Sequence, residues 1–140
     1  MKNFLFTKGE PIMLVIYPAI IHDDNDGLWA EFPDLQGCFT QGDTQAELLS
    51  NAAEAVECFL LGLLEDGGKI PEPTSPQSIK ITEPNTYTSL IEAKIDLAKN
   101  TKSIKKTLTI PAWLNKRALD ANINFSNLLQ DALIKELNIV

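Results

Sequence analysis

The sequence predicts an α+β protein with a strand-and-helix body and a smaller C-terminal module. Three observations predict this class. Strand-like alternation of apolar and polar residues flanks one long helical pattern at residues 44–65. A short strand followed by two helices fills residues 105–137. The charge also changes sign, because residues 1–98 carry sixteen acidic and five basic side chains, whereas residues 99–140 carry three acidic and seven basic.

This charge distribution suggests two different partners. An acidic body favours a cationic partner, and a basic module favours a polyanion such as nucleic acid. The alternative is chance variation of surface charge over a chain whose net charge is −7.

The body is expected to begin with a three-stranded meander. Its first strand is a nearly continuous apolar run, in which Pro18 indicates a bulge or an edge position. Asp26-Gly27 predicts a hairpin turn after this run. Gly37 predicts a bulge in the third strand. The expected strands of the meander are residues 12–21, 28–32 and 35–41.

A helix and a fourth strand complete the predicted body. Thr44 and Glu47 form a capping box, in which each side chain satisfies a free backbone donor at the start of a helix that runs to about Glu65. Four prolines make residues 69–85 an extended connection. Alternation over residues 86–96 then predicts the fourth strand.

The C-terminal module reads as strand, helix, helix. Leu108 and Ile110 alternate with polar residues, and Pro111 then begins a helix that runs to about Ala121. Ser126 is expected to cap the second helix. The strand has no partner strand within the module, so pairing with a second copy would complete it. The result is a homodimer, which could pair further into a tetramer, with a two-stranded ribbon that fits the DNA major groove.

The expected organisation is an N-terminal extension at residues 1–11, a body at residues 12–98 and the module at residues 99–140. Met13 is an alternative start. No apolar run is long enough for a membrane helix, and the N-terminus lacks a secretory pattern. We therefore expect a cytoplasmic protein without membrane contact, whose cysteines, Cys38 and Cys58, are reduced and buried.

Two stretches resemble known families. The C-terminal pattern is similar to the ribbon-helix-helix family of DNA-binding dimers. The body resembles the HicB family of antitoxins from toxin–antitoxin systems, over roughly residues 12–98. The motifs that carry the second resemblance are Tyr17-Pro18-Ala19, the run from Asp26 to Cys38, Thr40, Gly42-Asp43-Thr44, Asn51 to Ala55, and Gly68 to Pro73.

The resemblance implies a reduced RNase-H-like body that binds and blocks a small ribonuclease toxin, HicA, and a C-terminal module that binds operator DNA and represses the operon. Members of the family carry either a ribbon-helix-helix or a helix-turn-helix tail, and the strand at residues 104–110 favours the former here. This chain departs from the pattern in its N-terminal extension and in Asn124, where a glycine is common.

The resemblance directs attention to two sets of candidate binding residues. On the body, carboxylates around an exposed Trp29 would meet a basic nuclease surface; the alternative places Trp29 in the core beneath the helix. These candidates are Asp24, Asp26, Trp29, Glu31 and Asp34. On the module, the strand would read base edges, the start of the second helix would bind a phosphate, and further lysines would add non-specific attraction. These candidates are Lys105, Thr107 and Thr109, then Ser126 and Asn127, then Lys102 and Lys106.

The alternatives are a dimeric repressor that senses a small ligand and a nuclease that uses the RNase-H-like body. A two-metal nuclease needs several converging carboxylates. The candidate cluster is mostly one hairpin turn, where aspartate is common for conformational reasons. His22 is the only histidine, and it reads as a strand-end residue near solvent. We therefore expect no catalytic residues, no metal and no cofactor.

Overall fold

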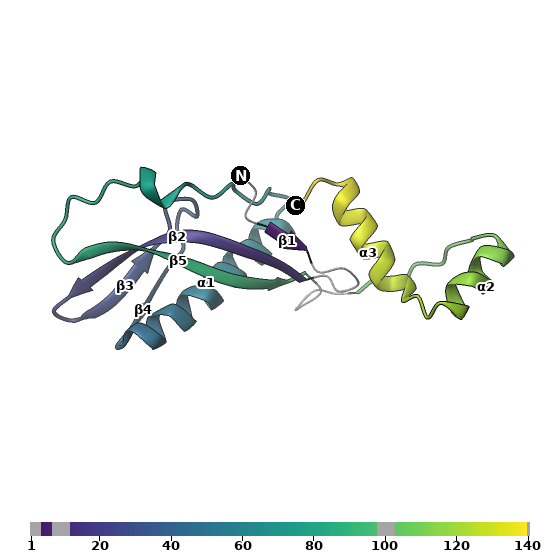
Figure 1. Cartoon of the computed structure of the whole chain (residues 1–140), viewed down its shortest axis with the longest axis horizontal. Coiled ribbons are helices and arrows are strands. Elements are labelled where there is room, and N and C mark those ends of the chain that lie inside the picture. Colours follow the sequence, from purple (N-terminus) through teal and green to yellow (C-terminus); the bar gives the residue numbers. More distant parts are fainter. Residues whose placement is uncertain (1–3, 7–11, 98–102, 140) are drawn as a thin grey trace.

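The computed structural model describes residues 4–6, 12–97 and 103–139. A five-stranded antiparallel sheet forms the body, and one long helix covers one of its faces (Figure 1). Two shorter helices form the C-terminal part. The elements in chain order are β1 (Phe4–Phe6), β2 (Ile12–Asp24), β3 (Gly27–Glu31), β4 (Phe39–Gly42), α1 (Gln45–Glu65), the short 3-10 helix η1 (Pro76–Ser78), β5 (Thr86–Asp96), α2 (Ala112–Asp120) and α3 (Phe125–Glu136).

Strand β2 organises the sheet. Its whole length from Ile12 to His22 pairs with β5 on one edge. On the other edge it pairs first with β1, at Met13–Val15, and then with β3, at Ile20–Asp24. Pro18 falls in the gap between these two pairings, so its missing N–H costs the sheet little. Pro18 thus lies in an internal strand and not at an edge, although one of its sides is unpaired among the described residues.

The core lies between the sheet and α1. Alternate β2 residues from Met13 to Ile21 are buried together with Leu48, Ala52, Val56 and Leu60 of the helix. The Tyr17 hydroxyl donates to the Pro71 carbonyl, which ties the connection after α1 to the sheet. Burial, with smaller contributions from the charges of Asp34 and Glu72, raises the pKa of Tyr17 above its ordinary value.

Most predicted body elements are confirmed. Thr44 is the N-cap of α1 and accepts from the Glu47 amide at 3.1 Å, and the helix ends at Glu65 as expected. β5 spans the predicted residues 86–96, with Ile91, Ala93 and Ile95 on the buried face.

The third strand differs from the prediction. Residues 35–38 form turns rather than a strand, with Leu35 and Cys38 donating to the carbonyls of Phe32 and Leu35. Gly37 has a φ of 92°, so its freedom serves a turn and not a bulge. Leu35 and Cys38 are both buried, and their spacing of three residues suits a turn that folds back onto the core.

Three other predictions change. Phe4–Phe6 pair with β2, so part of the expected N-terminal extension belongs to the sheet. Cys38 is buried, and burial, with a smaller contribution from Cys58, raises the pKa of its thiol to about 11; Cys58 itself is exposed. Asn124, not Ser126, caps α3, because its side chain accepts from the Asn127 amide at 3.1 Å.

The predicted strand at residues 104–110 stays a prediction. Residues 103–111 form no helix or strand in the single chain and are exposed. That prediction depends on pairing with a second copy of the chain. Asn122 has a φ of 55° in the turn between the last two helices, a left-handed conformation that asparagine tolerates.

Gly42 marks a close approach of β4 to the start of α1. A Cβ added there would lie 2.6 Å from the Leu48 amide nitrogen, whereas one added at Gly62 within α1 would meet nothing within 4 Å. Gly42→Ala is therefore expected to lower the free energy of unfolding by about 1–3 kcal/mol, the usual range for overpacking. Gly62→Ala should raise it by about 0.5–1 kcal/mol. Urea unfolding of both variants checks this, and equal stabilities would contradict the close approach.

Candidate partner-binding site

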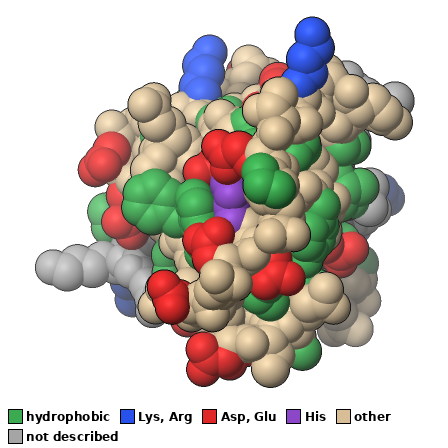
Figure 2. Space-filling view, turned by 90° about the vertical axis from the view of Figure 1, so that its left-hand side faces the viewer, with side chains coloured by type: hydrophobic (Ala, Val, Ile, Leu, Met, Phe, Trp, Pro, Cys, Tyr) green, Lys and Arg blue, Asp and Glu red, His purple; other side chains and the backbone are tan. Residues whose placement is uncertain are grey.

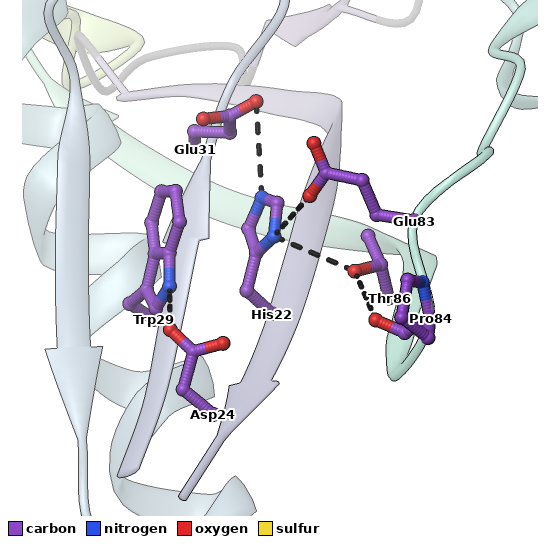
Figure 3. A network of polar contacts seen from close by, with 7 residues as sticks. All are labelled: His22, Asp24, Trp29, Glu31, Glu83, Pro84 and Thr86. Atoms are coloured by element: carbon purple, nitrogen blue, oxygen red, sulfur yellow. Dashed lines mark hydrogen bonds and ion pairs between the residues drawn. The ribbon is translucent and has the colours of Figure 1, made fainter. Parts of the chain in front are cut away.

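The β2–β3 hairpin places an aromatic pair at one end of the sheet. Its register sets His22 opposite Trp29. The two rings stack in parallel, with centroids 3.8 Å apart and planes 8° apart. The Trp29 indole Nε1–H donates to Asp24 Oδ2 at 2.8 Å, which fixes the indole orientation (Figure 3).

Trp29 lies on the sheet face opposite α1. The β2 residues that face the helix are the odd-numbered ones from Met13 to Ile21, and His22 and its cross-strand partner Trp29 belong to the other face. Trp29 is half-buried. It is thus neither a core residue beneath the helix nor a fully exposed anchor.

Carboxylates surround the His22 ring. Glu31 Oε1 lies 3.8 Å from Nε2, and Glu83 Oε2 lies 3.6 Å from Nδ1. The Thr86 hydroxyl lies 3.5 Å from Nδ1 (Figure 3). The histidine is only 8% exposed, yet its ring is visible at this end of the molecule between acidic side chains (Figure 2). His22 therefore lies at the end of a strand near the surface, as expected, but its side chain is largely shielded from solvent.

A shallow acidic groove of about 900 Å³ adjoins this cluster along the edge strand β4. Phe39 is 67% exposed on its wall, and Trp29 also lines it. Four carboxylates and no lysine or arginine line the groove, namely those of Asp24, Asp26, Asp43 and Glu47. The groove is therefore an acidic surface with two aromatic side chains, a composition suited to a basic protein partner.

The predicted body residues divide between two places. Asp24, Asp26 and Trp29 line the groove. Glu31 lies next to the groove, beside the His22 ring. Asp34 is elsewhere, because its two carboxylate oxygens accept from the amide and the hydroxyl of Thr74. This carboxylate holds the connection after α1 in place.

Sequence reasoning missed His22, Phe39, Asp43 and Glu47 as parts of this end. The predicted turn would not have identified His22. The turn residues are Asn25 and Asp26, because Asp24 pairs with Gly27, and this register sets His22 opposite Trp29. A turn at Asp26-Gly27 would have set His22 opposite Glu31. No local signal identifies Asp43 and Glu47, because their position depends on how α1 packs.

No group of three or more His, Cys, Asp or Glu side chains in the described part of the chain is arranged to hold a metal ion. Among the same residues, no helix is long and apolar enough to cross a membrane.

The predicted nucleic-acid residues lie in the C-terminal part. Lys105, Lys106, Thr107 and Thr109 are exposed, and Lys102 lies outside the described residues. Ser126 is exposed in the first turn of α3. The Asn127 amide already donates to Asn124, so it is not available to a phosphate in this conformation.

Large apolar side chains are exposed throughout the C-terminal part. Ile104 is 86% exposed and Leu108 60% exposed. Only one side of α3 is covered, where Ile134 packs beside α1 next to an apolar groove of about 320 Å³. Such a concentration of exposed apolar area is unusual for a monomer and marks an interaction surface. The exposed residues are Ile104, Leu108, Ile110, Trp113, Leu114, Leu119, Ile123, Phe125, Leu128, Leu133 and Leu137.

Comparison with known protein families identifies one family. A family profile described as the HicB-like antitoxin of bacterial toxin–antitoxin systems matches residues 17–136. The chain is 35% identical, over 74% of its length and 78% of the relative's, to an uncharacterized 14.9 kDa protein from the rep-hol intergenic region of Haemophilus phage HP1.

Solved structures show the same likeness. A toxin–antitoxin complex from Streptococcus pneumoniae contains a chain with a TM-score of 0.55 and 29% identity, covering 89% of this chain and 99% of that one. The antitoxin HicB of Burkholderia pseudomallei has a TM-score of 0.53 at 19% identity, covering 88% and 98%, which is a likeness of fold.

Proposed function

The chain is a member of the HicB-like antitoxin family of bacterial toxin–antitoxin systems, and from this premise we propose that it neutralises a HicA-like ribonuclease toxin and represses its own operon. The body would bind the toxin, and a dimeric C-terminal ribbon-helix-helix module would bind operator DNA. The protein would act in the cytoplasm and have no enzymatic activity of its own.

The acidic groove beside Trp29 is the observation that carries the toxin-binding proposal. A ribonuclease must bind a polyanion, so its substrate surface is expected to be basic. Groove carboxylates without a lysine or arginine among them match such a surface in charge, and Phe39 and Trp29 provide apolar contact. Occupying the basic surface would exclude RNA. The Streptococcus pneumoniae relative, whose structure is a toxin–antitoxin complex, supports this kind of partner.

The exposed apolar residues of the C-terminal part support the dimer. Pairing two copies through residues 104–110 would satisfy the open backbone groups of both segments and cover Leu108 and Ile110. The same pairing would place Lys105, Thr107 and Thr109 of both copies on the outer face of one ribbon, where base edges can be reached.

Charge reversal in the groove should weaken toxin binding. The variant Asp26→Lys/Asp43→Lys is expected to lower affinity by at least about tenfold at low salt, mainly through slower association. The loss should shrink as salt rises, because exposed charges are screened. Glu54→Lys, an exposed position of α1 outside the groove, is the matched control. Calorimetry with the purified toxin measures both, and equal affinities would place the interface elsewhere.

If the ribbon recognises DNA bases, substitutions of a base-contacting threonine and of a phosphate-contacting lysine should affect DNA binding differently. Thr107→Ala should relax the preference for operator over random DNA, because a base contact is lost. Lys102→Ala should weaken both complexes alike and reduce the slope of log affinity against log salt by about 1. Gel-shift titrations over a salt series distinguish them. Equal losses on both DNAs from Thr107→Ala would show that the strand reads no bases.

Dimerisation through the C-terminal segment can be tested with two leucines of similar exposure. Leu108 is 60% exposed in this segment, and Leu90 is 54% exposed on β5 of the body. Leu108→Glu is expected to yield a monomer, because it would bury a charge in the dimer interface. Leu90→Glu should remain a dimer. Sedimentation equilibrium gives the mass of each, and a dimeric Leu108→Glu protein would rule out this interface.

A further inference from the structure

His22 is a buried polar side chain that the body itself leaves partly unsatisfied. Its side chain is 10% exposed, and Nε2 is shielded from solvent without a hydrogen-bond partner among the described residues. Buried polar atoms are satisfied in the great majority of native structures, so an exception calls for an explanation. Nε2 is directed toward the Glu31 carboxylate, which is at the surface with 42% side-chain exposure.

The surrounding hydrogen bonds indicate the tautomer of the neutral ring. The Thr86 hydroxyl donates its one proton to the Pro84 carbonyl at 3.0 Å. Toward Nδ1 this hydroxyl can then only accept, and Glu83 Oε2 is a second acceptor 3.6 Å from Nδ1, so both contacts favour the tautomer with its proton on Nδ1. Nε2 is left as a lone-pair acceptor. It faces another acceptor, Glu31 Oε1, at 3.8 Å.

Two acceptors that face each other require a donor between or beside them. The protein supplies no cation there, since neither Glu31 nor Glu83 forms an ion pair with a lysine or arginine among the described residues. In Figure 2 the acidic side chains gather around the histidine, and the basic ones lie toward the edge of the view. The flat Trp29 indole stacks against one side of the His22 ring.

We propose that His22 Nε2 and the Glu31 carboxylate form a receptor for a basic side chain of the partner protein, with an arginine guanidinium as the best fit. A guanidinium has five N–H donors and no acceptor, so it can bond both atoms at once. Glu31 can turn outward to admit it, because its side chain is partly exposed. That this partner is the toxin rests on the proposed function; the receptor itself does not.

The ring nitrogens provide the first test. His22 is the only histidine, so nitrogen-edited NMR of the intact chain at neutral pH reports its protonation without assignment. The proposed receptor requires a neutral ring with the proton on Nδ1. A doubly protonated ring would overturn the proposal, because the imidazolium would then supply the positive charge and the missing donor itself.

The second test uses N-acetyl-arginine amide as the probe and the uncharged N-acetyl-citrulline amide as its control. The arginine compound should shift the His22 ring and Trp29 indole resonances in a saturable manner, and the citrulline compound should not. Glu31→Gln should weaken this binding by about tenfold, as expected for loss of a charge-assisted hydrogen bond. Glu92→Gln, an exposed carboxylate of β5, should have no effect. Equal responses to both compounds, or to both variants, would overturn the proposal.

The purified toxin separates this inference from the proposed function. His22→Phe keeps a ring that can stack on Trp29 but removes both nitrogens, and it should lower toxin affinity by about tenfold. If the toxin binds and this variant binds equally well, the receptor is not used and the inference fails, while the antitoxin function stands. If the arginine probe binds as expected but no toxin does, the proposed function fails and the receptor stands.

Discussion

The pairing of β2 with β5 along the whole of residues 12–22 is the interaction on which the rest of the body depends. It joins segments that are more than sixty residues apart, so forming it requires the closure of a long loop that contains α1. Once formed, it positions alternate β2 residues under α1 and directs His22 to the opposite face. The same pairing brings Thr86 to His22, and the chain just before it brings Glu83. The chemistry of the acidic end is therefore a consequence of sheet register.

Local signals predicted the elements that local physics determines. The Thr44 cap and the alternation of β5 depend on interactions within a few residues, and both were predictable. The β2–β3 hairpin was also predictable, but its turn is Asn25-Asp26 and not Asp26-Gly27. The turn at residues 35–38 was not predictable, because Leu35 and Cys38 are held by the core and not by a local motif. Asn124 displaced Ser126 as cap because either residue type serves equally well, and the position of the preceding turn decided between them.

The acidic site was predictable only in part, for a related reason. Asp24, Asp26 and Trp29 are near one another in sequence, so their proximity follows from the hairpin alone. Asp34 is close in sequence, but long-range hydrogen bonds to Thr74 direct it elsewhere. Glu83, Asp43 and Glu47 join the acidic end only through tertiary packing. The amino-acid composition thus indicated an acidic surface, but the fold determines which carboxylates belong to it.

The distance between the two ends of α1 bears on how the proposed activities coexist. Glu47 in the first turn of α1 lines the acidic groove, and Leu64 near its end lies beside α3. A helix of 21 residues spans about 30 Å, which is roughly four Debye lengths at physiological salt. The groove carboxylates therefore exert little repulsion on DNA held by the C-terminal module (Figure 1). Any coupling between toxin and operator binding therefore needs a route other than the long-range field of the acidic end, and the apolar groove that α1 and α3 line together is the place where the two parts meet.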